Sequence, residues 1–137
     1  MAKDAFHNAV KSALQKDGWI VSAGYYSLDV GGVQMEIDLS AERLIVAERR
    51  TEKIAVEVKS FLSPSAISEF HTALGQFINY RAALRLKEPE RILYLAVARS
   101  TYRNFFTRPF PRMMIEDNQV KLLVFHPQKE EIVQWIN

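Results

Sequence analysis

Cysteine is absent from this chain of 137 residues, which excludes disulfide bonds, thiolate zinc sites and cysteine nucleophiles. Any bound metal must therefore be held by oxygen atoms or by imidazole. Glycine and proline occur only five times each, without any linker, so residues 1–137 are predicted to form one domain. Long apolar runs and the apolar core of a signal peptide are also lacking, which predicts a cytoplasmic protein without a membrane partner.

Strong net charge is lacking as well. The formal net charge is +2, so the field of the whole molecule gives little support for nucleic-acid binding. Acidic residues, however, are missing throughout residues 99–115, where four arginines alternate with aromatic residues: Arg99, Arg103, Arg108 and Arg112, with Tyr102, Phe105, Phe106 and Phe110. This pattern suits a surface that binds phosphates and stacks on bases. The alternative is a loop whose aromatic residues pack internally and whose arginines are merely solvated.

The pattern of apolar residues predicts an α/β fold with a central mixed β-sheet flanked by helices. A first helix extends to the Asp17-Gly18 stop, and alternation predicts strands at residues 33–40 and 43–50 and from residue 54 onward, joined as an antiparallel meander. A helix that extends to about Lys87 is predicted to begin at Ser63-Pro64-Ser65. A strand at 91–98 completes this core. Outside it, the expected elements are strands at 19–22, 120–125 and 131–136 and a short helix at 101–106. The core order is α-β-β-β-α-β plus C-terminal strands.

The segment IAVEVKSF, residues 54–61, places a charged pair in an apolar strand. Glu57 and Lys59 are two residues apart and share one face, and Asp38 lies on the polar face of an earlier predicted strand. Because neighbouring strands are about 4.8 Å apart, Asp38 and Glu57 could hold one divalent cation, with the Val58 carbonyl as a third oxygen ligand.

Such a site has the parts that phosphodiester hydrolysis needs. The cation neutralises the anion and activates water, and Lys59 orients that water or stabilises the developing charge. Mg²⁺, or Mn²⁺ in its place, suits a site with few carboxylates. The alternative is that Glu57 and Lys59 form an ordinary solvated pair on a strand face. Glu36, on the face of Asp38, is either a further ligand or a solvated carboxylate. His7, His71 and His126 lack ligand spacing, so no zinc site is predicted.

The order Asp38, hairpin, Glu57-Val58-Lys59 and helix resembles the PD-(D/E)xK signature of nucleases with the restriction-endonuclease-like fold. Three segments, AERLIVAERRTEKIAVEVKSF, SAISEFHTALGQFINYR and RILYLAVA, resemble the XisH family, cyanobacterial proteins named as controlling factors for excision of the fdxN element. The resemblance covers nearly the whole chain and is most specific over residues 41–81. Ile37 stands where the signature has proline.

This resemblance implies catalytic roles for Asp38, Glu57 and Lys59, with Asp38 and Glu57 as metal ligands. It also implies that Gln76, with Tyr80 one turn later, joins the site from the following helix. The expected function is a divalent-metal-dependent DNA endonuclease, or a factor derived from one, in element excision. The alternative is a non-catalytic regulatory module that uses the nuclease fold to bind DNA or a partner protein. The expected partners are DNA and a small XisI-like protein, and a homo-oligomer is open by analogy with nucleases that cut both strands.

Overall fold

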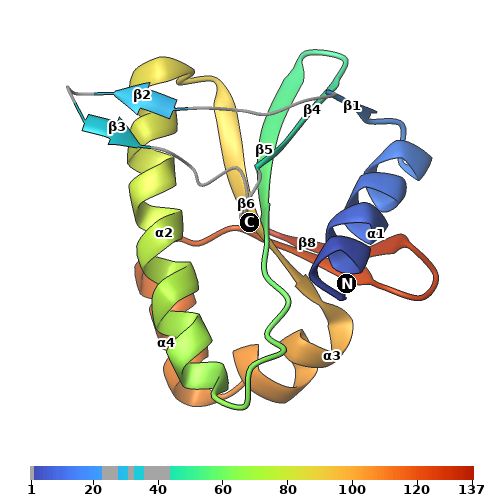
Figure 1. The fold of residues 1–137 in the computed structure, drawn as a ribbon, viewed down its shortest axis with the longest axis vertical. Helices are drawn as coiled ribbons and strands as arrows, with labels where there is room; N and C mark the ends of the chain where they lie inside the picture. The colour runs from blue at the N-terminus through green and yellow to red at the C-terminus, as the bar shows by residue number, and fades with distance from the viewer. Residues whose placement is uncertain (1, 23–27, 31–32, 36–43) are drawn as a thin grey trace.

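A six-stranded mixed sheet forms the centre of the computed structural model, which describes residues 2–22, 28–30, 33–35 and 44–137 (Figure 1). Its strand order is β1-β4-β5-β6-β7-β8. The strands are β1 Ile20–Val21, β4 Ile45–Arg49, β5 Glu52–Val58, β6 Arg91–Ala98, β7 Leu122–His126 and β8 Glu131–Ile136. β5, β6 and β7 are parallel to one another, and the other neighbours are antiparallel. The predicted α/β fold with a mixed sheet is confirmed, and the arrangement is consistent with a nuclease-like fold.

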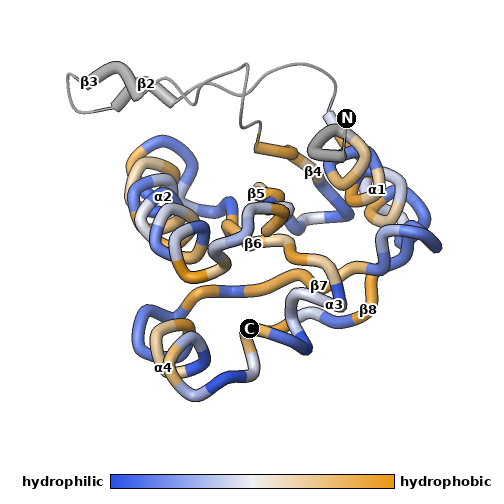
Figure 2. Tube along the Cα trace, turned by 60° about the horizontal axis from the view of Figure 1, so that its bottom comes forward, coloured by the Kyte–Doolittle hydropathy of each residue, from blue (hydrophilic) through white to orange (hydrophobic). Residues whose placement is uncertain are grey.

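Helices cover both faces of this sheet. They are α1 Ala2–Lys16, α2 Ala66–Lys87, the one-turn α3 Arg99–Thr101, a π-helical turn Tyr102–Phe106 and α4 Pro109–Asp117. Figure 1 shows α1 on one side of the sheet and α2 with α4 on the other. Figure 2 shows the hydrophobic strands β6 and β7 running between these helices. Among the described residues, no helix combines the length and apolar character needed to cross a membrane.

The sheet separates two hydrophobic cores. On the α1 side, Val10 and Leu14 pack with Ile54, Val56 and other residues of the sheet. A second cluster, on the α2 side, contains residues of α2 and of the segment 105–124, and β5 contributes Ala55 to it. Because successive strand residues point to opposite faces, β5 supplies both cores in alternation. This burial on both faces explains why the strand reads as a nearly continuous apolar run.

Helix α2 begins where the sequence predicts. The Ser65 side chain accepts a hydrogen bond from the main-chain N–H of Ser68 at 3.3 Å, which caps the helix. The buried residues are Phe70, Ala73, Phe77, Tyr80, Ala83 and Leu84. Ile67 and Ile78 are 42% and 37% exposed, although both are large apolar residues. The stripe that meets the sheet follows Phe70 at steps of three and four residues, and Ile67 and Ile78 lie beside it.

One further expectation needs correction, and one helix was not predicted. The meander was expected to pair the strand at 33–40 with β4, but β3 Val33–Met35 pairs with β2 Leu28–Val30 in a separate two-stranded sheet. In the described residues the outer neighbour of β4 is β1. Residues 36–43 lie outside the described part of the chain. Helix α4 was not predicted, because Pro109 and Pro111 suggest a loop, yet proline is tolerated in the first turn of a helix.

Candidate metal and phosphate site

Strand β5 points Glu57 into the interior of the protein. Glu57 is two residues beyond Ala55, which belongs to the core on the α2 side, so strand alternation directs Glu57 to the same face. Only 2% of the residue is exposed. The sequence therefore places a carboxyl group where an apolar side chain would be the ordinary choice.

Lys59 extends the strand and meets Glu57 and α2. Its main-chain N–H donates to the Ala96 carbonyl at 3.1 Å, which continues the pairing with β6 beyond the end of β5. The Lys59 Nζ lies 3.5 Å from the Glu57 Oε1 and donates a hydrogen bond to the Gln76 Oε1 at 2.5 Å. The structure thus brings together Glu57, Lys59 and Gln76. Tyr80, one turn beyond Gln76, is buried in the core on the α2 side.

Burial dominates the electrostatics of Glu57. Desolvation raises the pKa of its carboxyl group from 4.5 to about 8, despite the nearby Lys59 ammonium. Both carboxyl oxygens are buried without a hydrogen-bond partner among the described residues. Such a group is costly unless a cation or a donor compensates for the lost water. The two oxygens are therefore chemically suited to a divalent cation, which would also favour the ionised form.

The remaining predicted ligands are placed only in part. Val58, whose carbonyl is the predicted third ligand, is the last residue of β5, and its side chain packs against the core on the α1 side. Asp38 lies outside the described residues, and so does Glu36. Within the described ranges, no group of three histidine, aspartate or glutamate residues could hold a metal. A cation at Glu57 would need oxygen ligands besides those of the described acidic side chains.

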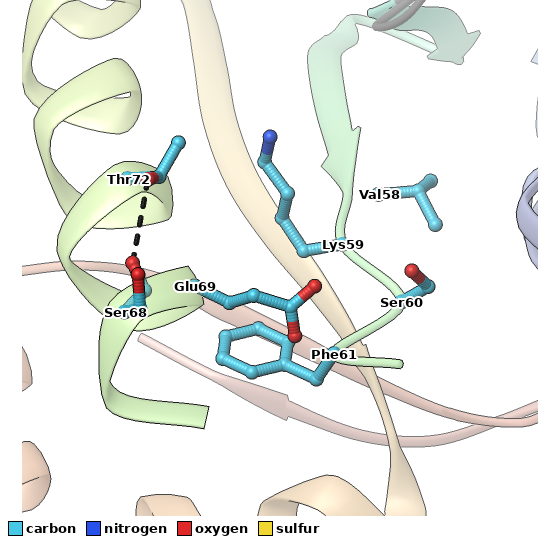
Figure 3. Close-up of a pocket in the computed structure, with 7 residues that line it drawn as sticks. All are labelled: Val58, Lys59, Ser60, Phe61, Ser68, Glu69 and Thr72. Atoms are coloured by element: carbon cyan, nitrogen blue, oxygen red, sulfur yellow. Dashed lines mark hydrogen bonds between the residues drawn. The ribbon is translucent and has the colours of Figure 1, made fainter. Parts of the chain in front are cut away.

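A small pocket opens beside Lys59, between the end of β5 and the first turns of α2. It has a volume of about 160 Å³ and is lined by Val58, Lys59, Ser60, Phe61, Ser68, Glu69 and Thr72 (Figure 3). Glu69 is a residue that the sequence reasoning missed. Glu69 lies in the first turn of α2, where an acidic residue is ordinarily explained by its favourable interaction with the helix dipole. Its position in the sequence therefore does not indicate a further role. The pattern of acidic and apolar residues alone could not have singled it out.

The arginine segment forms helical turns rather than a loop. Phe105 and Phe106 are buried, and both rings contact Phe61 and Phe70, so the packing alternative is correct for these two residues. The arginines have a different environment: Arg103, Arg108 and Arg112 are exposed and Arg99 is half-buried. Arg112 forms an ion pair with Glu116 at 3.1 Å. The contacts of Phe61 place this segment next to the pocket beside Lys59.

Comparison with known proteins connects this geometry to one family. The family model described as XisH protein matches residues 1–133. A crystal structure of an XisH family protein from Nostoc punctiforme PCC 73102 is 58% identical, with a TM-score of 0.90, covering 98% of this chain and 100% of that one. A second, of an fdxN element excision controlling factor protein from Anabaena variabilis, is 57% identical, with a TM-score of 0.89, covering 98% and 99%. A search of curated proteins finds no significant match. The chain belongs to the XisH family.

Proposed function

We propose that this protein is a divalent-metal-dependent DNA endonuclease, or a factor derived from one, that acts in the excision of a DNA element. The observation that carries the proposal is the buried Glu57 carboxyl, whose two oxygens lack hydrogen-bond partners among the described residues. A buried acid of this kind destabilises a protein unless it is compensated. A cation bound at this carboxyl, beside Lys59 and Gln76, would supply that compensation.

The chemistry assigned to each residue follows from its position. Glu57 and Asp38 would hold Mg²⁺ or Mn²⁺ together with the Val58 carbonyl, and the bound cation would supply Lewis acidity toward the phosphodiester and the attacking water. Lys59 would donate to a phosphate oxygen as negative charge develops there. The bond from Lys59 to Gln76 fixes the position of the ammonium, so Gln76 acts as a positioning residue.

The excision role rests on relatives. The 57% identical structure from Anabaena variabilis is described as an fdxN element excision controlling factor. At this identity and coverage, the fold and the surroundings of β5 and α2 are expected to be shared. DNA is then the substrate that a metal site with a fixed ammonium would act on. A small XisI-like protein is the proposed partner.

The exposed arginines of the segment that contacts Phe61 through Phe105 and Phe106 would supply a surface for the DNA backbone. Replacing Arg103 and Arg108 with alanine should reduce the slope of log K against log salt concentration by about 2, because each phosphate contact contributes about 0.9. A fluorescence titration at several salt concentrations measures this slope. The matched control replaces Arg85 and Lys129, which are also exposed and carry the same charge. Equal slopes for both double variants would show that Arg103 and Arg108 are solvated residues that do not contact the DNA phosphates.

The proposal is tested by incubating the purified protein with supercoiled, linear and branched DNA in Mg²⁺ or Mn²⁺, with and without the small partner. Cleavage that EDTA stops is the expected result. Absence of cleavage in every combination, with binding of DNA or partner retained, would instead identify a regulatory module that keeps the nuclease fold.

A further inference from the structure

The Glu69 carboxylate lines the pocket beside Lys59. Its Oε2 is buried and has no hydrogen-bond partner among the described residues. Figure 3 shows the side chain reaching from α2 toward the segment that carries Ser60 and Phe61, while the Lys59 side chain points away from the Glu69 carboxylate. Carboxylate oxygens accept hydrogen bonds, so Glu69 gives the pocket an acceptor for a donor group of a ligand.

A flat aromatic ring forms one side of the same pocket. The Phe61 backbone has a φ of 50°, a left-handed conformation that is unusual for an aromatic residue and costs about 1–3 kcal/mol. The ring is held from behind by Phe105 and Phe106, at centroid distances of 6.1 and 5.4 Å. Figure 3 shows the Glu69 carboxylate beside this ring. The pocket therefore combines an apolar plane with one acceptor at its edge.

These features favour a planar donor over a metal ion. A divalent cation of the Ca²⁺ or Mg²⁺ type takes at least six oxygen ligands and prefers several carboxylates or waters. Glu69 is the only carboxylate among the described residues that line the pocket, and no cluster of three ligating side chains occurs in the described part of the chain. The volume of about 160 Å³ is below the range of roughly 300–1,000 Å³ for drug-sized ligands, so it suits a single ring.

In a DNA strand, the hydrogen-bond donors inside the chain are the N–H groups of the bases, since phosphates and deoxyribose offer only acceptors. Cytosine presents its N4 amino group as a donor even in a duplex, and glutamate is a known type of acceptor for it. Thymine and uracil carry a carbonyl oxygen at the same ring position, which a carboxylate repels. The contact with Lys59 puts the pocket next to the position proposed for the reacting phosphate.

We propose that this pocket binds a base that carries an exocyclic amino group, with cytosine the best fit by size, and that Glu69 is the residue that selects it. The selection deepens the proposed function, because it assigns a base preference to the same site. Glu69 would accept the hydrogen bond of the amino group while the base lies against Phe61. The nucleotide so held would be next to the phosphate that Lys59 contacts.

The test compares binding of fluorescent single-stranded octamers of deoxycytidine and deoxyuridine, with Ca²⁺ in place of Mg²⁺. The two bases differ at the amino group and at the adjacent ring nitrogen. The wild type should bind the deoxycytidine octamer about tenfold more tightly, which corresponds to one specific base contact. Glu69→Ala should bring the ratio close to one, and the isosteric Glu69→Gln should reduce it. Glu131→Gln, an exposed change that removes the same charge, should leave the ratio unchanged.

The outcomes separate this inference from the proposed function. If the preference for the deoxycytidine octamer depends on Glu69 but the protein cleaves no DNA, the base pocket is supported and the nuclease function is excluded. If the wild type cleaves DNA but binds the two octamers equally, or if Glu69→Ala keeps the preference for deoxycytidine, the nuclease function is supported and the base pocket is overturned. Failure to bind either octamer also overturns it.

Discussion

Replacing Lys59 with alanine should lower the rate of DNA cleavage by about 10²- to 10³-fold, the usual effect of removing one donor that stabilises developing charge. The ammonium lies within the hydrogen-bonding distance of Gln76 and 3.5 Å from Glu57, at the end of the strand that forms the floor of the site. Because its contact with the phosphate strengthens in the transition state, the loss should appear in kcat more than in KM.

A structural role for Lys59 would give a different result. Lys129→Ala, which removes an exposed lysine far along the chain, should leave the cleavage rate unchanged and is the matched control. Circular dichroism and thermal melting show whether Lys59→Ala still folds. A folded Lys59→Ala protein that cleaves at the wild-type rate would exclude Lys59 from the chemistry.

Glu57 should make the metal-free protein less stable as the pH rises. Below pH 4.5 the carboxyl is protonated in the folded and the unfolded chain, and it has no effect on pH dependence. Between 4.5 and about 8 the unfolded chain releases the proton while the folded chain keeps it. The free energy of unfolding should therefore fall with rising pH, by at most about 1.4 kcal/mol per pH unit from this group.

The variant Glu57→Gln removes this dependence without changing the size of the side chain. Urea denaturation in EDTA, at several pH values between about 5 and 8, should show the variant gaining stability over the wild type as the pH increases. Glu131→Gln, at an exposed position, serves as the control and should follow the wild type. Parallel pH curves for wild type and Glu57→Gln would show that burial does not perturb this carboxyl.

Much of the fold follows from local pattern. The segments that became β6 and β8 coincide with the predicted strands, and β6 is apolar throughout after Arg91. Helix α2 was located by its serine cap and its stop before Pro89. The pairing of β3 with β2 instead of β4 was missed, since strand pattern identifies a strand but leaves its partner open.

The site was predictable where chemistry and strand period coincide. Two charges on one face of an apolar strand identify Glu57 and Lys59. Gln76 was expected only from the family resemblance, and the structure places its Oε1 in a hydrogen bond with Lys59. Glu69 was missed because its proposed role depends on a pocket that it forms with residues at the end of β5. No local sequence pattern predicts that pocket. The exposed arginines and the buried Phe105 and Phe106 alternate in one segment, and only tertiary packing separates their roles.

The central claim is that the buried carboxyl on β5 holds a divalent cation, and thermal melting in Mn²⁺ tests it most directly because no DNA substrate is required. At a concentration about 100-fold above Kd, the cation should stabilise the wild type by about 2.7 kcal/mol. Neither Glu57→Gln nor Asp38→Ala should gain this stabilisation, whereas Glu131→Gln should gain all of it. Equal stabilisation of wild type and Glu57→Gln, or none in the wild type, would contradict a metal site at Glu57.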